Sequence, residues 1–316
     1  PAPSMWRSID AGMNFTCGVT TAGAVKCWGT NGHGQLGTGN RIDAATPQAV
    51  VGLASGAVSV SAGAWHACAV METGDAHCWG FGQYGQLGNG SFRSSTTPVL
   101  VADLAGQVAG LSAGANHTCV VTTSGTAACW GANPFGQLGD GTRANRNAPV
   151  RVFNLDSGVR AIAAGDSHTC AVKADGSVAC WGRNVSGQAS APAGTFRTVT
   201  TGQQHSCGIR DDGTVACWGA ANMIANIPSG TFLAIDAGSY HTCGLRTDHT
   251  IVCWGLNDFD VFLNPPSGAF IALSTTFYHG CGVHVDGTIG CWGASSADQL
   301  VGIPSGTFTA VTTPAR

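Results

Sequence analysis

Short segments in which apolar and small residues alternate recur along the whole chain. VRAIAAG from Val159 is followed by HTCAVK from His168 and, after the turn at 174–176, by VACWG from Val178. Alternation with a period of two is typical of half-buried β-strands, and a three-residue connection that ends in Gly is common in β-hairpins. The pattern therefore predicts three short antiparallel strands in each unit, with a tight hairpin between the second and the third.

Fourteen cysteines define the repeat. They form seven pairs spaced i, i+10, and Trp-Gly follows the second cysteine of every pair. Successive first cysteines lie 51, 51, 51, 37, 36 and 38 residues apart. Three long repeats (about 1–157) are therefore followed by four short repeats (about 158–306), and the part that varies is the connection between units.

The hairpin register predicts how the cysteines pair. If residues 174–176 form the loop, Lys173 faces Ser177 and Cys170 lies directly opposite Cys180, in a non-hydrogen-bonded pair with Cα atoms about 4.5 Å apart. A disulfide tolerates this distance. We therefore expect seven intra-hairpin disulfides: Cys17–Cys27, Cys68–Cys78, Cys119–Cys129, Cys170–Cys180, Cys207–Cys217, Cys243–Cys253 and Cys281–Cys291.

Disulfides on this scale indicate an oxidising compartment, so we expect a secreted, periplasmic or cell-surface protein. The alternative is metal binding by cysteine and histidine. Structural zinc sites favour CxxC-like spacing, whereas one hairpin offers two ligands and no third. We expect no metal.

Seven β units of 36 to 51 residues, none able to bury both faces of its sheet alone, favour radial packing of blades. The fold class predicted is all-β, a seven-bladed β-propeller with one intra-hairpin disulfide per blade, forming a single domain over 1–316. Trp and Cys are adjacent in CWG, so each indole should meet one neighbouring blade and the disulfide the other. The first-strand pattern occurs eight times, at both 6–12 and 308–313. Residues 307–316 are thus a surplus strand, and one terminal copy should complete the ring.

GQLGTG from Gly34, GQLGNG from Gly85 and GQLGDG from Gly136 each follow a CWG and precede a Pro-containing connection. These residues resemble the regulator of chromosome condensation repeat family, which implies a seven-bladed propeller. The short repeats, best seen from Ser157, are similar to the secreted propeller-type β-lactamase inhibitory proteins of the same superfamily. GQLG decays to GQAS at Gly187 and is missing from the last three units. Function does not transfer by fold alone.

Composition excludes several functional classes. The chain has 47 Gly, 10 % charged residues and a formal net charge of −3 without a basic cluster. A mainly helical protein and a nucleic-acid partner are therefore not expected. The longest uncharged stretch, 44–71, contains Pro47 and His66 and several Gly and Ser. It does not predict a membrane segment.

Histidine precedes the first cysteine by two residues in six units: His66, His117, His168, His205, His241 and His279. A residue placed at one radius in every blade suits a buried hydrogen bond better than a shared catalytic or metal site. The acids are scattered in turns, and neither a nucleophile elbow nor a phosphate loop is present. We therefore expect no catalysis and no cofactor.

Chain direction places the loops between the first and second strands (GxxH) and the loops after CWG on one face. Large aromatic residues at these positions are typical of a protein-binding surface. The partner-binding residues expected are Trp65, Phe81, Tyr84, Phe135, Tyr240, Phe259 and Tyr278.

The function predicted is a monomeric, secreted or cell-surface propeller that binds another protein or cell-surface macromolecule. One alternative is a proteinaceous inhibitor of a secreted enzyme such as a β-lactamase. A hydrolase or lyase with an axial site is a third reading, and it would require two or three acids or histidines on the axis.

Overall fold

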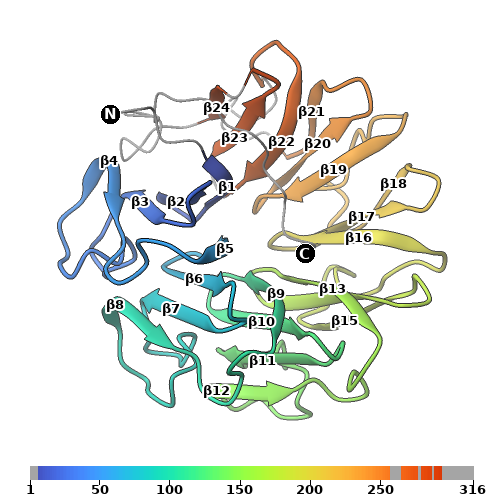
Figure 1. Ribbon diagram of the computed structural model, residues 1–316. Helices are drawn as coiled ribbons and strands as arrows, with labels where there is room; N and C mark the ends of the chain where they lie inside the picture. The colour runs from blue at the N-terminus through green and yellow to red at the C-terminus, as the bar shows by residue number, and fades with distance from the viewer. Residues whose placement is uncertain (1–5, 257–264, 277–278, 287, 294–316) are drawn as a thin grey trace.

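The computed structural model describes residues 6–256, 265–276, 279–286 and 288–293 (Figure 1). Seven antiparallel sheets are arranged around one axis as the blades of a propeller, and the part of the chain that the structure describes contains no helix (Figure 1). Among these residues, therefore, none forms a helix that could cross a membrane.

Blades one to three have four strands each. They are β1 (Trp6–Ala11), β2 (Phe15–Thr20), β3 (Val25–Gly29) and β4 (Ala44–Ala49); β5 (Ala57–Ala62), β6 (His66–Met71), β7 (Ala76–Gly80) and β8 (Ser95–Leu100); and β9 (Val108–Ala113), β10 (His117–Thr122), β11 (Ala127–Gly131) and β12 (Arg146–Arg151). Blades four to seven have three described strands each. They are β13 (Val159–Ala164), β14 (His168–Lys173) and β15 (Val178–Gly182); β16 (Phe196–Thr201), β17 (His205–Arg210) and β18 (Val215–Gly219); β19 (Phe232–Ala237), β20 (His241–Arg246) and β21 (Ile251–Gly255); and β22 (Phe270–Thr275), β23 (His279–His284) and β24 (Ile289–Gly293).

The fourth strands β4, β8 and β12 lie in segments that the sequence indicated only as Pro-containing connections. Each has Pro at its fourth position, namely Pro47, Pro98 and Pro149. Proline lacks an N–H donor and is tolerated at the edge of a sheet. The three long repeats therefore use their extra residues to cover the outer edge of the blade.

The disulfide framework is confirmed. Cys170 lies opposite Cys180 in the antiparallel register of β14 and β15, and the other six pairs are equivalent. The Cα atoms of each pair are 4.0 to 4.1 Å apart, slightly closer than the generic spacing for such a pair. One hairpin has no Gly in its turn, and there His249 takes a φ of 68°.

Alternation of tryptophan and disulfide between blades is also confirmed. Trp79 of blade two belongs to the same buried cluster as Cys17 and Cys27 of blade one. Trp130 of blade three packs in the same cluster as the cysteines of blade two, and Trp181 of blade four packs against the cluster that holds the cysteines of blade three. The sequence CWG thus places two core groups on opposite faces, and each blade interface takes one from either side.

Close approach at the axis depends on glycine. A Cβ built on Gly114, the residue directly after β9, would overlap the carbonyl oxygen of Gly165 in the next blade. Gly12, Gly63, Gly165, Gly202 and Gly238 are in the same situation. In blade seven the corresponding residue is Thr276. The inner ring is therefore tightest through blades one to six.

The first and last blades meet through named contacts. Ser274 Oγ donates to Asp10 Oδ1 at 3.0 Å, and Asp10 Oδ2 accepts the N–H of Ala62 in blade two at 3.0 Å. Trp6, Ile9 and Trp28 share a buried cluster with Ala272 and Val283. The amino-terminal first-strand copy is therefore the inner strand of blade one. The second copy, at 308–313, lies outside the described residues, and its role in closure stays a prediction.

Candidate protein-binding face

Two loops of each blade form one face of the propeller. The residue after CWG donates its N–H to the carbonyl of the residue directly before the second strand of the blade, as in Phe81 to Trp65 at 2.8 Å and Arg183 to Ser167 at 2.9 Å. The same bond joins Thr30 to Asn14, Ala132 to Asn116, Ala220 to Gln204 and Leu256 to Tyr240. The expectation that both variable loops emerge together is therefore correct for blades one to six.

A glutamine fixes the tip of the loop after CWG. The side-chain oxygen of Gln86 accepts the N–H of Tyr84 at 3.0 Å, and Gln137 holds Phe135 in the same way at 3.0 Å. Equivalent bonds run from the N–H of His33 to the Gln35 side-chain oxygen at 2.8 Å and from the N–H of Ser186 to the Gln188 side-chain oxygen at 2.9 Å. One backbone geometry thus presents His, Tyr, Phe or Ser at the same place in successive blades.

Three of the aromatic residues predicted from sequence lie together across blades one and two. The ring of His33 contacts Trp65 and Phe81 edge-on, with centroids 5.3 and 5.0 Å apart. Phe81 in turn contacts Tyr84 edge-on at 5.7 Å. Tyr84 is 42 % exposed, and the other three rings are partly exposed. We refer to His33, Trp65, Phe81 and Tyr84 as the aromatic patch.

His33 was not among the predicted residues. The signal that would identify it is its position two residues before the Gln of GQLG, which is also the position of Tyr84 and Phe135. Because only Trp, Tyr and Phe were considered at this position, His33 was missed, although the His33 ring contacts both Trp65 and Phe81.

The remaining predicted residues are not part of the patch. Phe135 is 43 % exposed, and the guanidinium of Arg183 lies 5.2 Å from its ring centroid. Tyr240 is partly buried in the loop between β19 and β20 of blade six. Phe259 and Tyr278 lie outside the described residues.

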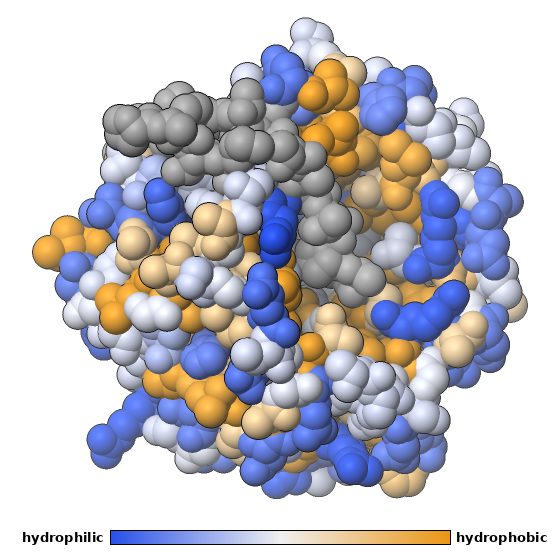
Figure 2. Space-filling view, in the orientation of Figure 1, coloured by the Kyte–Doolittle hydropathy of each residue, from blue (hydrophilic) through white to orange (hydrophobic). Residues whose placement is uncertain are grey.

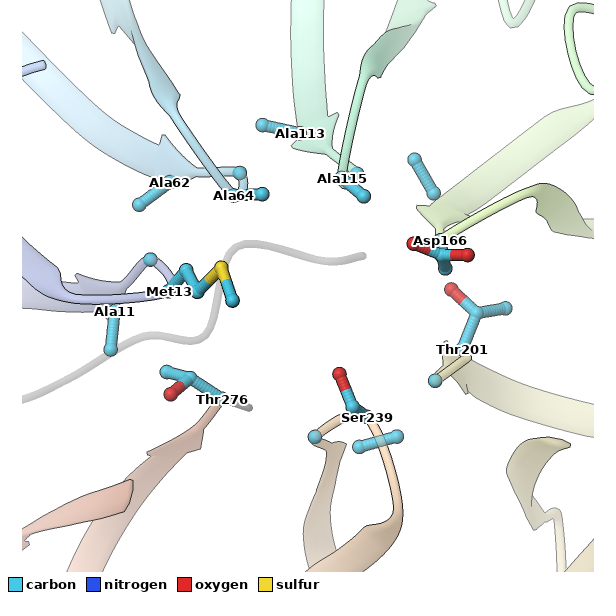
Figure 3. Close-up of a pocket in the computed structure, with 18 of the residues that line it drawn as sticks. Ala11, Met13, Ala62, Ala64, Ala113, Ala115, Asp166, Thr201, Ser239 and Thr276 are labelled. Atoms are coloured by element: carbon cyan, nitrogen blue, oxygen red, sulfur yellow. The ribbon is translucent and has the colours of Figure 1, made fainter. Parts of the chain in front are cut away.

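A small pocket of about 70 Å³ opens on the axis (Figure 3). Ala and Gly residues from successive blades make up most of its lining, and Met13 points towards the middle (Figure 3). Among the described residues that line it, Asp166 is the one ionisable side chain. Burial raises the pKa of Asp166, opposed by a 3.0 Å hydrogen bond from Ser167 and by the charge of Arg183. This lining offers one acid where an axial hydrolase would need two or three.

The repeated histidines are internal. Burial lowers the pKa of His117 to about 3 and that of His205 to about 4, so both rings are neutral at ordinary pH. His117 Nε2 lies 2.8 Å from the Thr169 hydroxyl of the next blade. No group of three potential metal ligands occurs in the described ranges. His66, His168 and His205 likewise lie 2.8 Å from a hydroxyl of the next blade, so four of the six histidines join blades instead of tying a strand to a loop of their own blade. His279 Nδ1 lies 3.2 Å from the Thr276 hydroxyl within blade seven.

Hydrophobic side chains (orange) are spread around the ring between hydrophilic ones on the face that Figure 2 shows, outside the grey atoms. Hydropathy alone therefore does not single out one patch. Partly exposed rings in edge-on contact on a fixed backbone make the aromatic patch the strongest candidate site in the described structure.

The fold defines a disulfide-bonded, repeat-built β-propeller, and its loop-built face is the candidate binding surface. Models of the regulator of chromosome condensation (RCC1) repeat match residues 6–35, 57–86, 108–137, 159–188, 196–222 and 232–260, and a second model of this repeat matches 22–70, 73–121 and 124–172. The chain belongs to the regulator of chromosome condensation repeat family.

Similar proteins include receptors and receptor ectodomains. The chain is 34 % identical over 185 residues to the ultraviolet-B receptor UVR8 of Arabidopsis thaliana, covering 58 % of this chain and 42 % of that protein. The ectodomain of the Physcomitrella patens receptor kinase CR4 has a TM-score of 0.67 at 25 % identity, covering 92 % of this chain and 74 % of that one. The ectodomain of the Arabidopsis thaliana receptor kinase ACR4 has a TM-score of 0.66 at 23 % identity, covering 96 % and 98 %. The chain spans less than half the length of the curated relatives it matches.

Proposed function

We propose that this chain is a non-catalytic propeller of an oxidising compartment, secreted or at the cell surface, that binds another protein through the face bearing the aromatic patch. The patch carries the proposal. Trp and Tyr are favoured anchors of protein interfaces because they bury a large area at low conformational cost. Here the rings are partly exposed and are held against one another across two blades.

Two further observations support this function. Seven disulfides are typical of proteins that leave the cytosol. Receptor-kinase ectodomains are among the solved structures that the chain resembles. A secreted enzyme is one class of partner that this face could take, and inhibition would then be the result of binding.

Site-specific photo-crosslinking tests the proposal. A photoreactive residue at position 84 should crosslink a partner from culture medium or from a cell surface, and Trp65→Ala should remove that adduct. The matched control is the same photoreactive residue at position 285, since Val285 is 59 % exposed in the hairpin turn at the other end of blade seven. Equal crosslinking at both positions, or an adduct insensitive to Trp65→Ala, contradicts the proposal.

A further inference from the structure

Blade four exposes an edge that blade three covers. β11 and β15 share the sequence Ala-Cys-Trp-Gly over their last four residues. Every residue of β11 is buried, whereas every residue of β15 is partly exposed. The difference is β12, which pairs with β11, while the sheet of blade four ends at β15.

The shorter repeat keeps the loop after CWG and omits the segment that carries the fourth strand. In blade three that segment leaves at Gly139 and returns at Phe153, whose N–H donates to the Gly139 carbonyl at 2.8 Å. In blade four the Asn184 side chain accepts the N–H of Ala189 at 2.8 Å, as Asn133 accepts that of Leu138 at 3.0 Å. Ser190 therefore corresponds to Gly139 in this loop.

Ala191 follows Ser190 directly, without an excursion like that of residues 140–152. The connection to blade five then reaches β16 in a few residues and makes no backbone hydrogen bond to β15 in the described structure. The position that β12 takes on β11 consequently has no counterpart in blade four.

The main-chain groups along this edge are suited to pairing. Cys170 and Cys180 form a non-hydrogen-bonded pair, so the N–H and C=O of Cys180 point away from β14. The same holds for Val178, which lies two residues earlier. In blade three the equivalent groups of Cys129 face Val150 of β12.

β15 also lacks the features that protect an edge strand. VACWG contains no charge and no Pro, and no register shift separates β14 from β15. Such an edge is a template for strand addition. The side chains on both faces of β15, including the partly exposed Trp181, would become more buried if a further strand paired with this edge.

We propose that β15 binds an extended segment of a partner protein as a fourth strand, in the position that β12 takes on β11. The fourth strands of this chain define the chemistry of that segment. Each has six residues with Pro at the fourth position, and the fifth pairs with the outer cysteine of its blade. In two of them the fifth residue is Val99 or Val150, which packs against the core. An uncharged Pro-Val step in an extended peptide is therefore the recognition element.

Binding of this kind is β-strand addition, in which main-chain hydrogen bonds provide affinity and side-chain pockets provide selectivity. The edge lies on the rim of the propeller, in a blade that contributes nothing to the aromatic patch. The inference is thus independent of the function proposed above.

The direct test uses a fluorescent synthetic peptide with the sequence of residues 144–153, ANRNAPVRVF, titrated with the full chain. Saturable binding is expected, with hydrogen-exchange protection at Val178 and Cys180. The matched control is the same peptide N-methylated at the residue that corresponds to Val150. It should bind at least about tenfold more weakly, since it loses a main-chain donor. No binding, equal binding of the methylated peptide, or protection only at β18 or β21 overturns the proposal.

A variant that fills the edge provides the second test. Insertion of residues 140–151 between Ser190 and Ala191 should give a folded protein that binds the peptide at least about tenfold more weakly. Trp65→Ala should leave peptide affinity unchanged, which separates this site from the aromatic patch. Unchanged affinity in the folded insertion variant contradicts the proposal. A native dimer that becomes a monomer on insertion also overturns it, because the occupant is then a second copy of the chain.

Discussion

His66 Nε2 in blade two lies 2.8 Å from the hydroxyl of Thr118 in blade three. The Thr118 hydroxyl donates its proton to the carbonyl of Gln86 at 3.0 Å, so the imidazole is the donor in the first bond. The same carbonyl accepts the indole N–H of Trp130 at 2.9 Å. The Gln of GQLG thus serves twice, its side chain fixing the loop tip and its carbonyl anchoring the next blade.

Thr118→Val should destabilise the protein by about 1–3 kcal/mol, because the Nε2 donor of His66 loses its acceptor in a fully buried place. The matched control is Thr73→Val, since Thr73 is exposed and bonds only within its own turn. Urea unfolding measures both. Equal free energies of unfolding for the two variants would show that the hydrogen bonds from His66 to Thr118 and from Thr118 to Gln86 contribute nothing to stability.

Acid should unfold this propeller well above the pKa of any single buried histidine. Burial lowers the pKa of His66, His117, His168 and His241 to about 3, and that of His205 and His279 to about 4. The unfolded chain takes up these protons from about pH 6.5 downwards. Stability is therefore fully present above that pH and falls as the pH drops towards 4, by up to about 1.4 kcal/mol per pH unit for each histidine.

The pH dependence of the melting temperature checks this expectation. His117→Gln keeps a side-chain donor for Thr169 and removes one titrating group, so its melting temperature should fall less steeply between pH 6 and pH 4. A native chain whose melting temperature is flat over this interval would contradict the argument.

Gly114→Ala should destabilise the protein by about 2 kcal/mol or more, because the added methyl overlaps the carbonyl oxygen of Gly165. Gly32→Ala is the matched control, since a Cβ there meets nothing within 4 Å. Calorimetry of both variants measures the difference. A Gly114→Ala protein as stable as Gly32→Ala would mean that the inner ring can widen freely.

The disulfides should not be equally reducible. The outer cysteines Cys27, Cys78 and Cys129 are fully buried beneath fourth strands, whereas Cys180, Cys217 and Cys253 are partly exposed in blades without one. Limited reduction followed by alkylation and mass spectrometry should label blades four to six before blades one to three. Uniform labelling would show that global unfolding, not exposure, controls reduction.

Alanine at Trp65 or Tyr84 should weaken binding of the partner by more than about 1 kcal/mol each without altering the melting temperature. Phe153→Ala is the control, because Phe153 is 74 % exposed and lies after β12, away from the loop tips. The partner identified by crosslinking is purified without the crosslink, and titration with each variant gives the affinities. Neutral effects at both positions would place the binding site elsewhere.

Much of the architecture follows from local sequence. The i, i+10 spacing fixes a hairpin register, and that register alone sets each cysteine opposite its partner. Trp beside Cys in a strand necessarily leaves by the opposite face, so the interlocking of tryptophan and disulfide between blades also follows from adjacency. Variable aromatic residues in loops that share a face could be predicted because strand direction alternates.

Contacts between blades could not be predicted in this way. That Gln86 meets Trp130, or that His33 lies between Trp65 and Phe81, depends on the angle and distance at which rigid sheets pack. The same holds for exposure, since Ala-Cys-Trp-Gly is buried in β11 and partly exposed in β15. A repeated sequence determines the blade, because hydrogen-bond register is local. Tertiary packing decides which copies are covered and which side chains meet, because those distances arise only when seven separate sheets close around one axis.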